Sequence, residues 1–502
     1  MKNGIVIVEP ADARFLRPGL LPDNKVAGSA IYKLAGALKA EGYKMVSIVL
    51  GNQSIEDVVA KIVRMRPRIL GLSCLTATFD TGIRIAEAVK QTLPEVAVVL
   101  GGYHISEVPS SILDSPAFNV GVVGLGEAPL LALARYYCDG QGELEEIPQL
   151  LVPDHTAGSF HKTGLSTLPA TDNWAWSAPN LTDLRRYRCG GLFYPSRPRQ
   201  TGVVPIVTAQ GCPNSCKFCS TGALLASGHG TRCGAVLRDP HDAARELRSY
   251  LDKGINTALI TTPSFNLPAE GMEAQCQAFI DEGLHDGSEE GPSHLSKAMH
   301  MYAYLTVGIT EAQARLMARA GISVGAVGVE AVGRKELRQL GKPYGYQNSP
   351  EAAALSTFRA LDSVGIISRA LFMFPGTTDG PDSLKELLKF LTCLQPDVIR
   401  TSWPCPSFGT LEGRRLREAG MVVTDDRQKY DHNCQLVRCE GFTPGQLTTL
   451  HNDIASAYYC SPEYRAHVEA KVREFPHLRM SFHYFFSRMR KKSEGRIDLR
   501  FL

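Results

Sequence analysis

The chain has 502 residues, of which 44% are hydrophobic and 21% charged, as in ordinary globular proteins. Its net charge of +3 at pH 7 gives no argument for nucleic acid or an anionic membrane as a partner. No apolar run approaches the roughly 18 residues that span a bilayer, and the first residues do not form a signal peptide, so we expect a cytoplasmic protein. The thirteen cysteines are an odd and scattered number, which argues against a secreted disulfide framework and favours metal binding by any close group.

Residues 4–137 alternate short apolar runs with segments of helical periodicity. The predicted strands are 5–8, 46–50, 69–73, 96–100 and 120–123, and the predicted helices are about 29–42, 54–66, 80–92, 107–114 and 127–137. This alternation predicts βαβ units and a parallel sheet covered on both faces. Such a sheet binds ligands at the carboxyl ends of its strands. Those ends carry 74–78, 101–104 and 124–127.

Composition and periodicity divide the rest of the chain into three segments. Residues 151–200 are rich in Pro, Ser, Thr and Arg without a sustained period, which predicts a linker. Six strand-and-helix units then follow one another, and from about residue 425 the pattern is helical and rich in aromatic residues. The predicted domains are therefore 1–150, a linker at 151–200, 201–425 and a helical region at 426–502.

Three cysteines stand close together after the first strand of the third segment, in Gly211-Cys-Pro-Asn-Ser-Cys-Lys-Phe-Cys-Ser220. Their short spacing lets Cys212, Cys216 and Cys219 converge on one metal centre, and three ligands on a four-iron cluster leave one iron open. Zinc is the alternative. It is disfavoured because His229 lies too far along the chain for the usual zinc spacing, although Cys233 is also near.

This motif resembles that of the radical S-adenosylmethionine (SAM) enzymes, and the stretches 262–267, 328–330 and 374–377 resemble later landmarks of that family in the same order. The resemblance implies an open partial (β/α)6 barrel whose cluster binds and reductively cleaves SAM to a 5′-deoxyadenosyl radical. It places Phe218, Asn266 and Glu330 beside SAM. We expect the helical C-terminal region to cap the mouth of this barrel.

The first domain resembles the cobalamin-binding domain that precedes many radical SAM modules, through Leu100-Gly-Gly-Tyr-His104 and Val123-Gly-Leu-Gly-Glu-Ala128. The resemblance implies a Rossmann or flavodoxin-like fold. It also implies cobalamin contacts at Thr76, Ala77, Thr78, Gly101, Gly102, His104, Gly124 and Gly126. No Asp-x-His-x-x-Gly motif is present, so we expect no histidine below cobalt and a side chain from the 74–78 loop there. For His104, a loop histidine hydrogen-bonded to backbone is an equal alternative.

Together the two halves resemble the cobalamin-dependent radical SAM enzymes, including the class B methyltransferases, over nearly residues 1–425. The resemblance implies methylation of an unactivated carbon in a small natural-product substrate, with flavodoxin or ferredoxin as electron donor. The alternatives are a radical SAM lyase, dehydratase, cyclase or ring-contracting enzyme, with or without bound cobalamin. An auxiliary cluster at Cys405, Cys434, Cys439 and Cys460 is a weaker hypothesis, because their spacing is loose.

Overall fold

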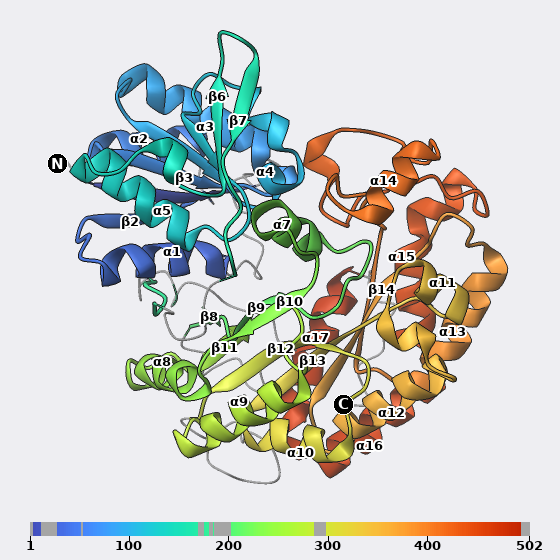
Figure 1. The fold of residues 1–502 in the computed structure, drawn as a ribbon. Helices are drawn as coiled ribbons and strands as arrows, with labels where there is room; N and C mark the ends of the chain where they lie inside the picture. The colour runs from blue at the N-terminus through green and yellow to red at the C-terminus, as the bar shows by residue number, and fades with distance from the viewer. Residues whose placement is uncertain are drawn as a thin grey trace.

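The computed structural model describes residues 4–11, 28–51, 54–168, 175–179, 184, 202–285 and 298–492. They form two α/β units that lie side by side, followed by a set of C-terminal helices (Figure 1). Residues 169–174, 180–183 and 185–200 of the predicted linker lie outside this description. In the described part of the chain, every helix is too short or too polar to cross a membrane.

The first unit is a seven-stranded sheet in the order β2-β1-β3-β4-β5-β6-β7. Its first five strands are parallel, so their order confirms the flavodoxin-like fold. One face packs on α1 and α5 and the other on α2 and α3, which explains why the inner strands are apolar throughout. The elements are β1 (Ile5–Pro10), α1 (Ser29–Ala40), β2 (Val46–Gly51), α2 (Ile55–Met65), β3 (Ile69–Ser73), α3 (Phe79–Thr92), β4 (Ala97–Gly101), α4 (Tyr103–Glu107), β5 (Val120–Val122), α5 (Glu127–Ala134), β6 (Leu150–Asp154) and β7 (Ser159–Lys162).

This sheet continues past residue 150, where the sequence predicted the linker to begin. β6 and β7 form an antiparallel hairpin whose first strand pairs with β5. Three of the four residues in β7 are exposed, so this edge strand lacks the apolar run that marks the inner strands. Residues 151–162 therefore belong to the sheet and not to a linker.

The second unit is a six-stranded parallel sheet in the order β15-β14-β13-β12-β11-β8, which confirms the partial (β/α)6 barrel. A short antiparallel ribbon, β9–β10, stands beside it. The elements are β8 (Val204–Ile206), β9 (Ala209–Cys212), α7 (Ser220–His229), β10 (Gly234–Leu237), α8 (Pro240–Asp252), β11 (Thr257–Ile260), α9 (Ala269–Asp281), β12 (His300–Thr306), α10 (Glu311–Arg319), β13 (Ile322–Glu330), α11 (Arg334–Gln339), α12 (Pro350–Asp362), β14 (Ile367–Met373), α13 (Pro381–Leu394) and β15 (Val398–Ser402).

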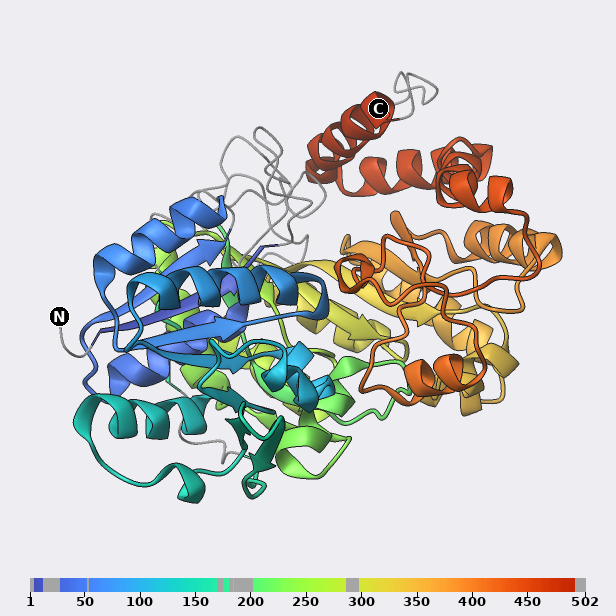
Figure 2. The ribbon, with the colours of Figure 1, turned by 90° about the horizontal axis from the view of Figure 1, so that it is seen from above.

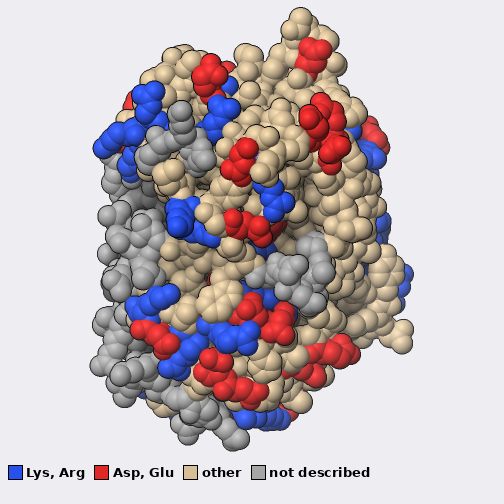
Figure 3. Space-filling model, turned by 60° about the vertical axis from the view of Figure 1, so that its left-hand side comes forward, with Lys and Arg blue, Asp and Glu red and all other residues tan. Residues whose placement is uncertain are grey.

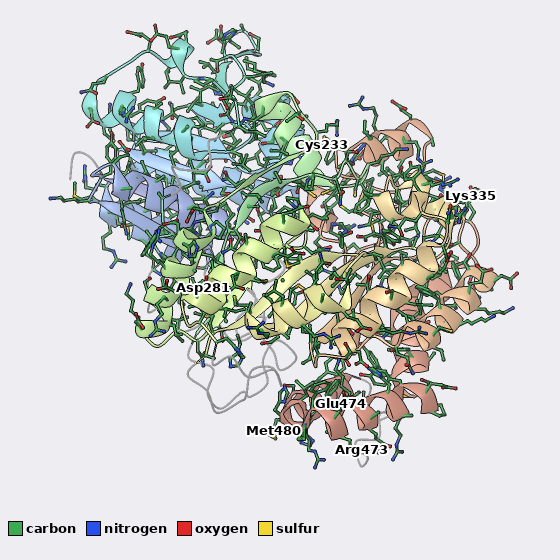
Figure 4. The ribbon with its side chains drawn as sticks, turned by 60° about the horizontal axis from the view of Figure 1, so that its bottom comes forward. Cys233, Asp281, Lys335, Arg473, Glu474 and Met480 are labelled. Atoms are coloured by element: carbon green, nitrogen blue, oxygen red, sulfur yellow. The ribbon has the colours of Figure 1, made fainter. Side chains whose placement is uncertain are left out.

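The last helices lie along the open edge of the barrel, on the side away from the first domain (Figure 2). They are α15 (Pro444–Tyr459), α16 (Pro462–Glu474) and α17 (Arg479–Lys492). The Tyr459 hydroxyl accepts a hydrogen bond from the Ile399 amide of β15 at 2.9 Å, and the Tyr458 hydroxyl donates to the Pro396 carbonyl at 2.7 Å. Arg473 and Glu474 lie far from Cys233 in Figure 4. These helices therefore cover the edge of β15, which would otherwise be an exposed edge strand, and do not cap the mouth of the barrel. The prediction that this region caps the mouth is wrong for them.

The segment between β15 and α15, which includes α14 (Leu411–Glu418), reaches the first domain instead. The Arg427 guanidinium pairs with Asp114 at 2.8 Å and with Asp80 at 3.5 Å, and it lies 5.1 Å from the centre of the Phe79 ring. These contacts join the segment to the start of α3, next to the 74–78 loop.

A buried ion-pair network fastens α16 to the amino ends of β14 and β15. The Asp397 carboxylate accepts hydrogen bonds from the Ser368 amide at 2.7 Å, from His467 Nε2 at 3.0 Å and from Lys471 Nζ at 2.5 Å. Lys471 Nζ also lies 2.9 Å from Asp362. Asp362, Asp397 and His467 are grouped as metal ligands often are, but the Lys471 ammonium already occupies the place of a cation between the two carboxylates. The network is therefore a structural one.

Charges on the face shown in Figure 3 are mixed in sign. Lysine and arginine side chains alternate there with aspartate and glutamate, and the visible described surface has no continuous basic field. This face therefore offers no electrostatic footprint for nucleic acid.

Candidate functional site

The three cysteines of the motif lie in one loop between β9 and α7. Cys212 ends β9, Cys219 directly precedes α7, and the Cys219 amide donates to the Cys216 carbonyl at 3.1 Å. None forms a disulfide, and each is partly exposed. Burial raises the pKa of Cys216 to about 12 against the pull of Lys342, and the adjacent Cys219 and Cys212 add to the rise. Each thiolate makes the next one harder to form, because their negative charges repel. A cationic [4Fe–4S] cluster would hold all three as thiolates, so the three cysteines fit such a cluster.

The residues considered for zinc are not arranged around one centre. Cys233 lies beside Cys212, because Gly234 pairs with Cys212 across the β9–β10 ribbon, and it is exposed (Figure 4). His229 faces elsewhere: its Nδ1 lies 3.0 Å from the Ser166 hydroxyl, and its Nε2 accepts from the Leu125 amide at 3.4 Å. The zinc alternative therefore lacks its histidine ligand.

Glu330 and Phe218 are brought together next to the cysteine loop by a residue that the sequence did not reveal. The Lys342 ammonium pairs with the Glu330 carboxylate at 3.0 Å and lies 5.9 Å from the centre of the Phe218 ring. Burial by itself lowers the pKa of Lys342, but the Glu330 carboxylate raises it above its usual value, so the lysine is charged. Lys342 lies in a loop twelve residues beyond Glu330, and no motif marked it.

Gly328 provides the room for this ion pair. A Cβ at position 328 would lie 2.5 Å from Glu330 Oε1 and 3.1 Å from Lys342 Nζ. Glu330 itself has a φ of 68°, which a non-glycine residue rarely adopts. A glycine two residues before the glutamate therefore fits this turn, because the Glu330 carboxylate lies over the space that a side chain at position 328 would fill.

Asn266 is hydrogen-bonded on both sides of its side-chain amide. Its side-chain amide donates to the Thr306 carbonyl at 3.1 Å and accepts from the Thr306 amide at 2.9 Å, and only 6% of the residue is exposed. These bonds join the loop after β11 to the end of β12. Asn266 therefore supports this loop, and its contact with SAM stays a prediction.

A cavity of about 220 Å³ lies between the carboxyl ends of the first sheet and the start of the barrel. The first domain contributes four of the predicted cobalamin contacts to its wall: Gly101, Gly102, Gly124 and Gly126. The barrel contributes the opposite wall, in part through residues of α7: Thr221, Leu224 and Leu225. The cavity is therefore shared between the two units, at the sheet edge where the sequence predicted a ligand.

The remaining predicted contacts do not line this cavity, and His104 is buried. It is 1% exposed, with Nδ1 3.2 Å from the Thr76 hydroxyl, Nε2 3.1 Å from the Ser111 hydroxyl and its ring 4.1 Å from that of Phe79. Burial lowers the pKa of His104 to about 3, with Arg427 adding to the effect, so the ring is neutral. The His104 ring is thus held by two side-chain hydroxyl groups and not by the backbone of its loop, and its contact with cobalamin stays a prediction.

The 74–78 loop presents a different side chain from those named. Ala77 and Thr78 are buried, and the Thr78 hydroxyl accepts from the Leu75 amide at 3.1 Å. Leu75 is 48% exposed at the end of β3. Leu75 is thus the most exposed side chain of this loop, Thr76 beside it is partly exposed, and both could touch a ligand.

Helix α7 connects the cysteine loop to the cavity. It begins directly after Cys219, and its last turn packs on the first domain so closely that a Cβ on Gly124 would lie 2.7 Å from the Gly228 Cα. A polar contact supports the same junction: Glu127 Oε1 accepts from Lys33 Nζ and from Gln210 Nε2, both at 2.8 Å. No motif or spacing predicted that one helix would contact both sites.

The four cysteines considered for an auxiliary cluster lie in different surroundings. Cys405 accepts from the Ser407 hydroxyl, Cys439 donates to the Asp379 carbonyl at 3.4 Å, and Cys460 is exposed at the end of α15. The three thiols thus have different neighbours, and an auxiliary cluster stays a prediction.

Comparison with known proteins agrees with this arrangement. The B12 binding domain family matches residues 27–134, and the radical SAM superfamily matches residues 206–391. The chain is 21% identical over 435 residues to the anaerobic magnesium-protoporphyrin IX monomethyl ester cyclase of Cereibacter sphaeroides, covering 82% of this chain and 64% of that protein, a little under two thirds. It is 22% identical to an uncharacterized methyltransferase of Pyrococcus horikoshii, covering 84% of each.

The fold has a solved counterpart in the radical SAM methyltransferase TsrM from Kitasatospora setae, with a TM-score of 0.69 and 16% identity over 97% of this chain and 100% of that one. A radical SAM domain implies a [4Fe–4S] cluster and SAM as cofactors, and a B12 binding domain implies cobalamin. The cysteine loop and the glycine-lined cavity lie within the two matched ranges. The chain therefore carries a B12-binding domain followed by a radical SAM domain.

Proposed function

We propose that the chain transfers a methyl group to an unactivated carbon of a small organic substrate, with a flavodoxin or ferredoxin as electron donor. When bound, the cluster supplies the electron that cleaves SAM to methionine and a 5′-deoxyadenosyl radical, and cobalamin serves as the methyl carrier. Such chemistry requires the two cofactors to face one substrate from different sides.

The observation that carries this proposal is the position of α7. Its first residue follows a cluster ligand, its middle lines the cavity, and its end contacts Gly124 of the first domain. If the cavity lay away from α7, the first domain would have only a structural role. The shared helix instead favours a reaction in which both cofactors take part.

The chain's own residues would supply binding and orientation. Cys212, Cys216 and Cys219 would hold the cluster, and the Glu330–Lys342 pair would place charge of both signs next to it. The glycines at the cavity wall allow the backbone to approach a large ligand closely. Leu75, exposed at the end of β3, would lie against the corrin in place of a histidine.

A radical cyclase is the second candidate, because the Cereibacter sphaeroides relative bears that name. The same parts would serve it, and the fate of the SAM methyl group separates the two reactions. A lyase or dehydratase would differ in the same way.

The proposal is tested on anaerobically reconstituted protein incubated with hydroxocobalamin, desalted, and then reduced with methyl-labelled SAM. We expect about four irons and one corrinoid per chain, with label recovered in the corrinoid fraction. Bound corrinoid with 5′-deoxyadenosine formed and no label transferred would favour the cyclase. Four irons without corrinoid would favour a lyase or dehydratase with a structural first domain.

Replacing Lys342 by methionine should make the cluster harder to reduce. The ammonium lies beside Cys216 and is 7% exposed at its side chain, so its charge is poorly screened. An EPR-monitored redox titration should give a more negative midpoint potential for Lys342→Met at unchanged iron content. Lys342→Arg keeps the charge and should stay near the wild-type potential. Equal potentials in all three proteins would exclude this role.

A further inference from the structure

Two arginines face the interior of the barrel on neighbouring strands. β14 carries Arg369 and β15 carries Arg400, and the register places Arg400 level with Leu371, two residues beyond Arg369 on the same face. That face is the interior, because Phe372 points the other way and meets Phe390 of α13, with 6.5 Å between ring centres. The two guanidinium groups therefore share one side of the barrel.

The strands in front of them leave space. Tyr304, Ala326 and Arg369 are level across β12, β13 and β14, and the next interior position on β13 is Gly328. Ala326 and Gly328 are small residues between a tyrosine and an arginine, and we call the space over β13 that they border the notch; the Tyr302 side chain hydrogen-bonds Arg369 from the same face. Tyr304 is 38% exposed although β12 lies inside the sheet, which requires open space in front of its ring.

Hydrogen bonds to neutral side chains position the Arg400 guanidinium. Its Nη2 donates to Asn433 Oδ1 at 2.7 Å and its Nε to the Ser402 hydroxyl at 3.3 Å. Burial lowers the pKa of Arg400 and Arg369 lowers it further, while the nearby Asp431 carboxylate acts in the opposite direction. Like charges side by side on adjacent strands cost stability. A bound oxyanion would remove that cost, and the guanidinium fork matches a carboxylate or a phosphate.

We infer that this notch binds an oxyanion group of the substrate, with a planar part of the same molecule against the Tyr304 ring. The inference rests on the proposed function only in naming the ligand as the substrate. SAM also carries a carboxylate. Arg369 lies three residues along β14 from Phe372, the residue paired with Glu330, or about 10 Å at roughly 3.3 Å per residue. Arg369 is thus deeper in the barrel than the charged pair beside the cysteine loop, whereas Arg400, which is level with Leu371, lies one residue from the level of that pair.

The test uses the full reconstituted chain and three probes: phenylacetate, phenyl phosphate and the neutral phenylacetamide. Calorimetry should show that at least one anion binds and that the amide does not. Arg369→Gln and Arg400→Gln should each weaken anion binding by about tenfold to a hundredfold, and Arg400→Lys should recover part of it. Arg315→Gln, an exposed arginine on α10, is the matched control and should bind as the wild type does.

SAM affinity measured in the same variants separates the two sources of carboxylate. Unchanged SAM binding with lost anion binding supports a substrate site. Lost SAM binding in Arg369→Gln or Arg400→Gln would assign the arginines to SAM and overturn the inference. So would probes that bind equally with and without charge, or anions that fail to bind the wild type. None of these results depends on corrinoid loading or turnover, so failure of the proposed function is seen separately.

Discussion

Reconstituted Cys216→Ala protein should hold close to no iron, against about four atoms per wild-type chain, and should cleave no SAM. Cys216 lies in the middle of the loop that places three thiols together, so its loss leaves two ligands for a cluster that already has one open iron. Iron and sulfide analysis, together with chromatography of 5′-deoxyadenosine after reduction, would measure both effects.

Cys233→Ala is the matched control, since Cys233 lies beside Cys212 across the β9–β10 ribbon but outside the motif. It should keep its iron and its SAM cleavage. If Cys233→Ala lost the cluster while Cys216→Ala kept it, the ligand assignment would be wrong. About eight irons in the wild type would instead point to a second cluster.

Lys471→Met should lower the free energy of unfolding by about 3–5 kcal/mol, the usual cost of breaking a buried ion pair on one side. The side chain is 1% exposed and contacts Asp397, which is 0% exposed, so the substitution leaves a buried carboxylate without its cation. Chemical denaturation of the full chain would measure the change. Lys385→Met removes a lysine whose partner Asp382 is exposed, and it should have little effect.

The same network predicts how stability depends on pH. Burial alone would raise the pKa of Asp397, but the Lys471 ammonium and His467 lower it to about 2. A carboxyl group with a depressed pKa in the folded state contributes stability above its unfolded pKa. This contribution should be lost as the pH falls from about 4 towards 2. Asp397→Asn should flatten that part of the stability profile; a profile that matches the wild type would show that Asp397 does not control it.

The sequence predicted the elements best where burial is two-sided. β3 (Ile69–Ser73) was predicted to the residue because both of its faces pack on helices, which leaves a continuous apolar run. The edge strand β7 (Ser159–Lys162) was missed because its side chains are mostly exposed. The start of α15 carries a local signal, because Thr443 and Gln446 form a capping box and Pro444 occupies the first turn.

Site residues were predicted where spacing along the chain fixes the chemistry, as in the cysteine motif. They were missed where the partner comes from elsewhere. Lys342 meets Glu330 through a loop, and His104 and Asn266 are satisfied by neighbours that only the fold brings near. The location of the C-terminal helices was wrong for the same reason: periodicity shows that a helix has an apolar face but not which strand that face covers.

The shared helix α7 has a thermodynamic consequence for how the enzyme is loaded. It starts at a cluster ligand and ends against the backbone of Gly124, so it is the element through which the two sites would be coupled. Any coupling of this kind is reciprocal: if cluster assembly raises corrinoid affinity by some factor, corrinoid raises the affinity for the cluster by the same factor. The order in which the two cofactors enter would then alter the rate of maturation but not the final occupancy.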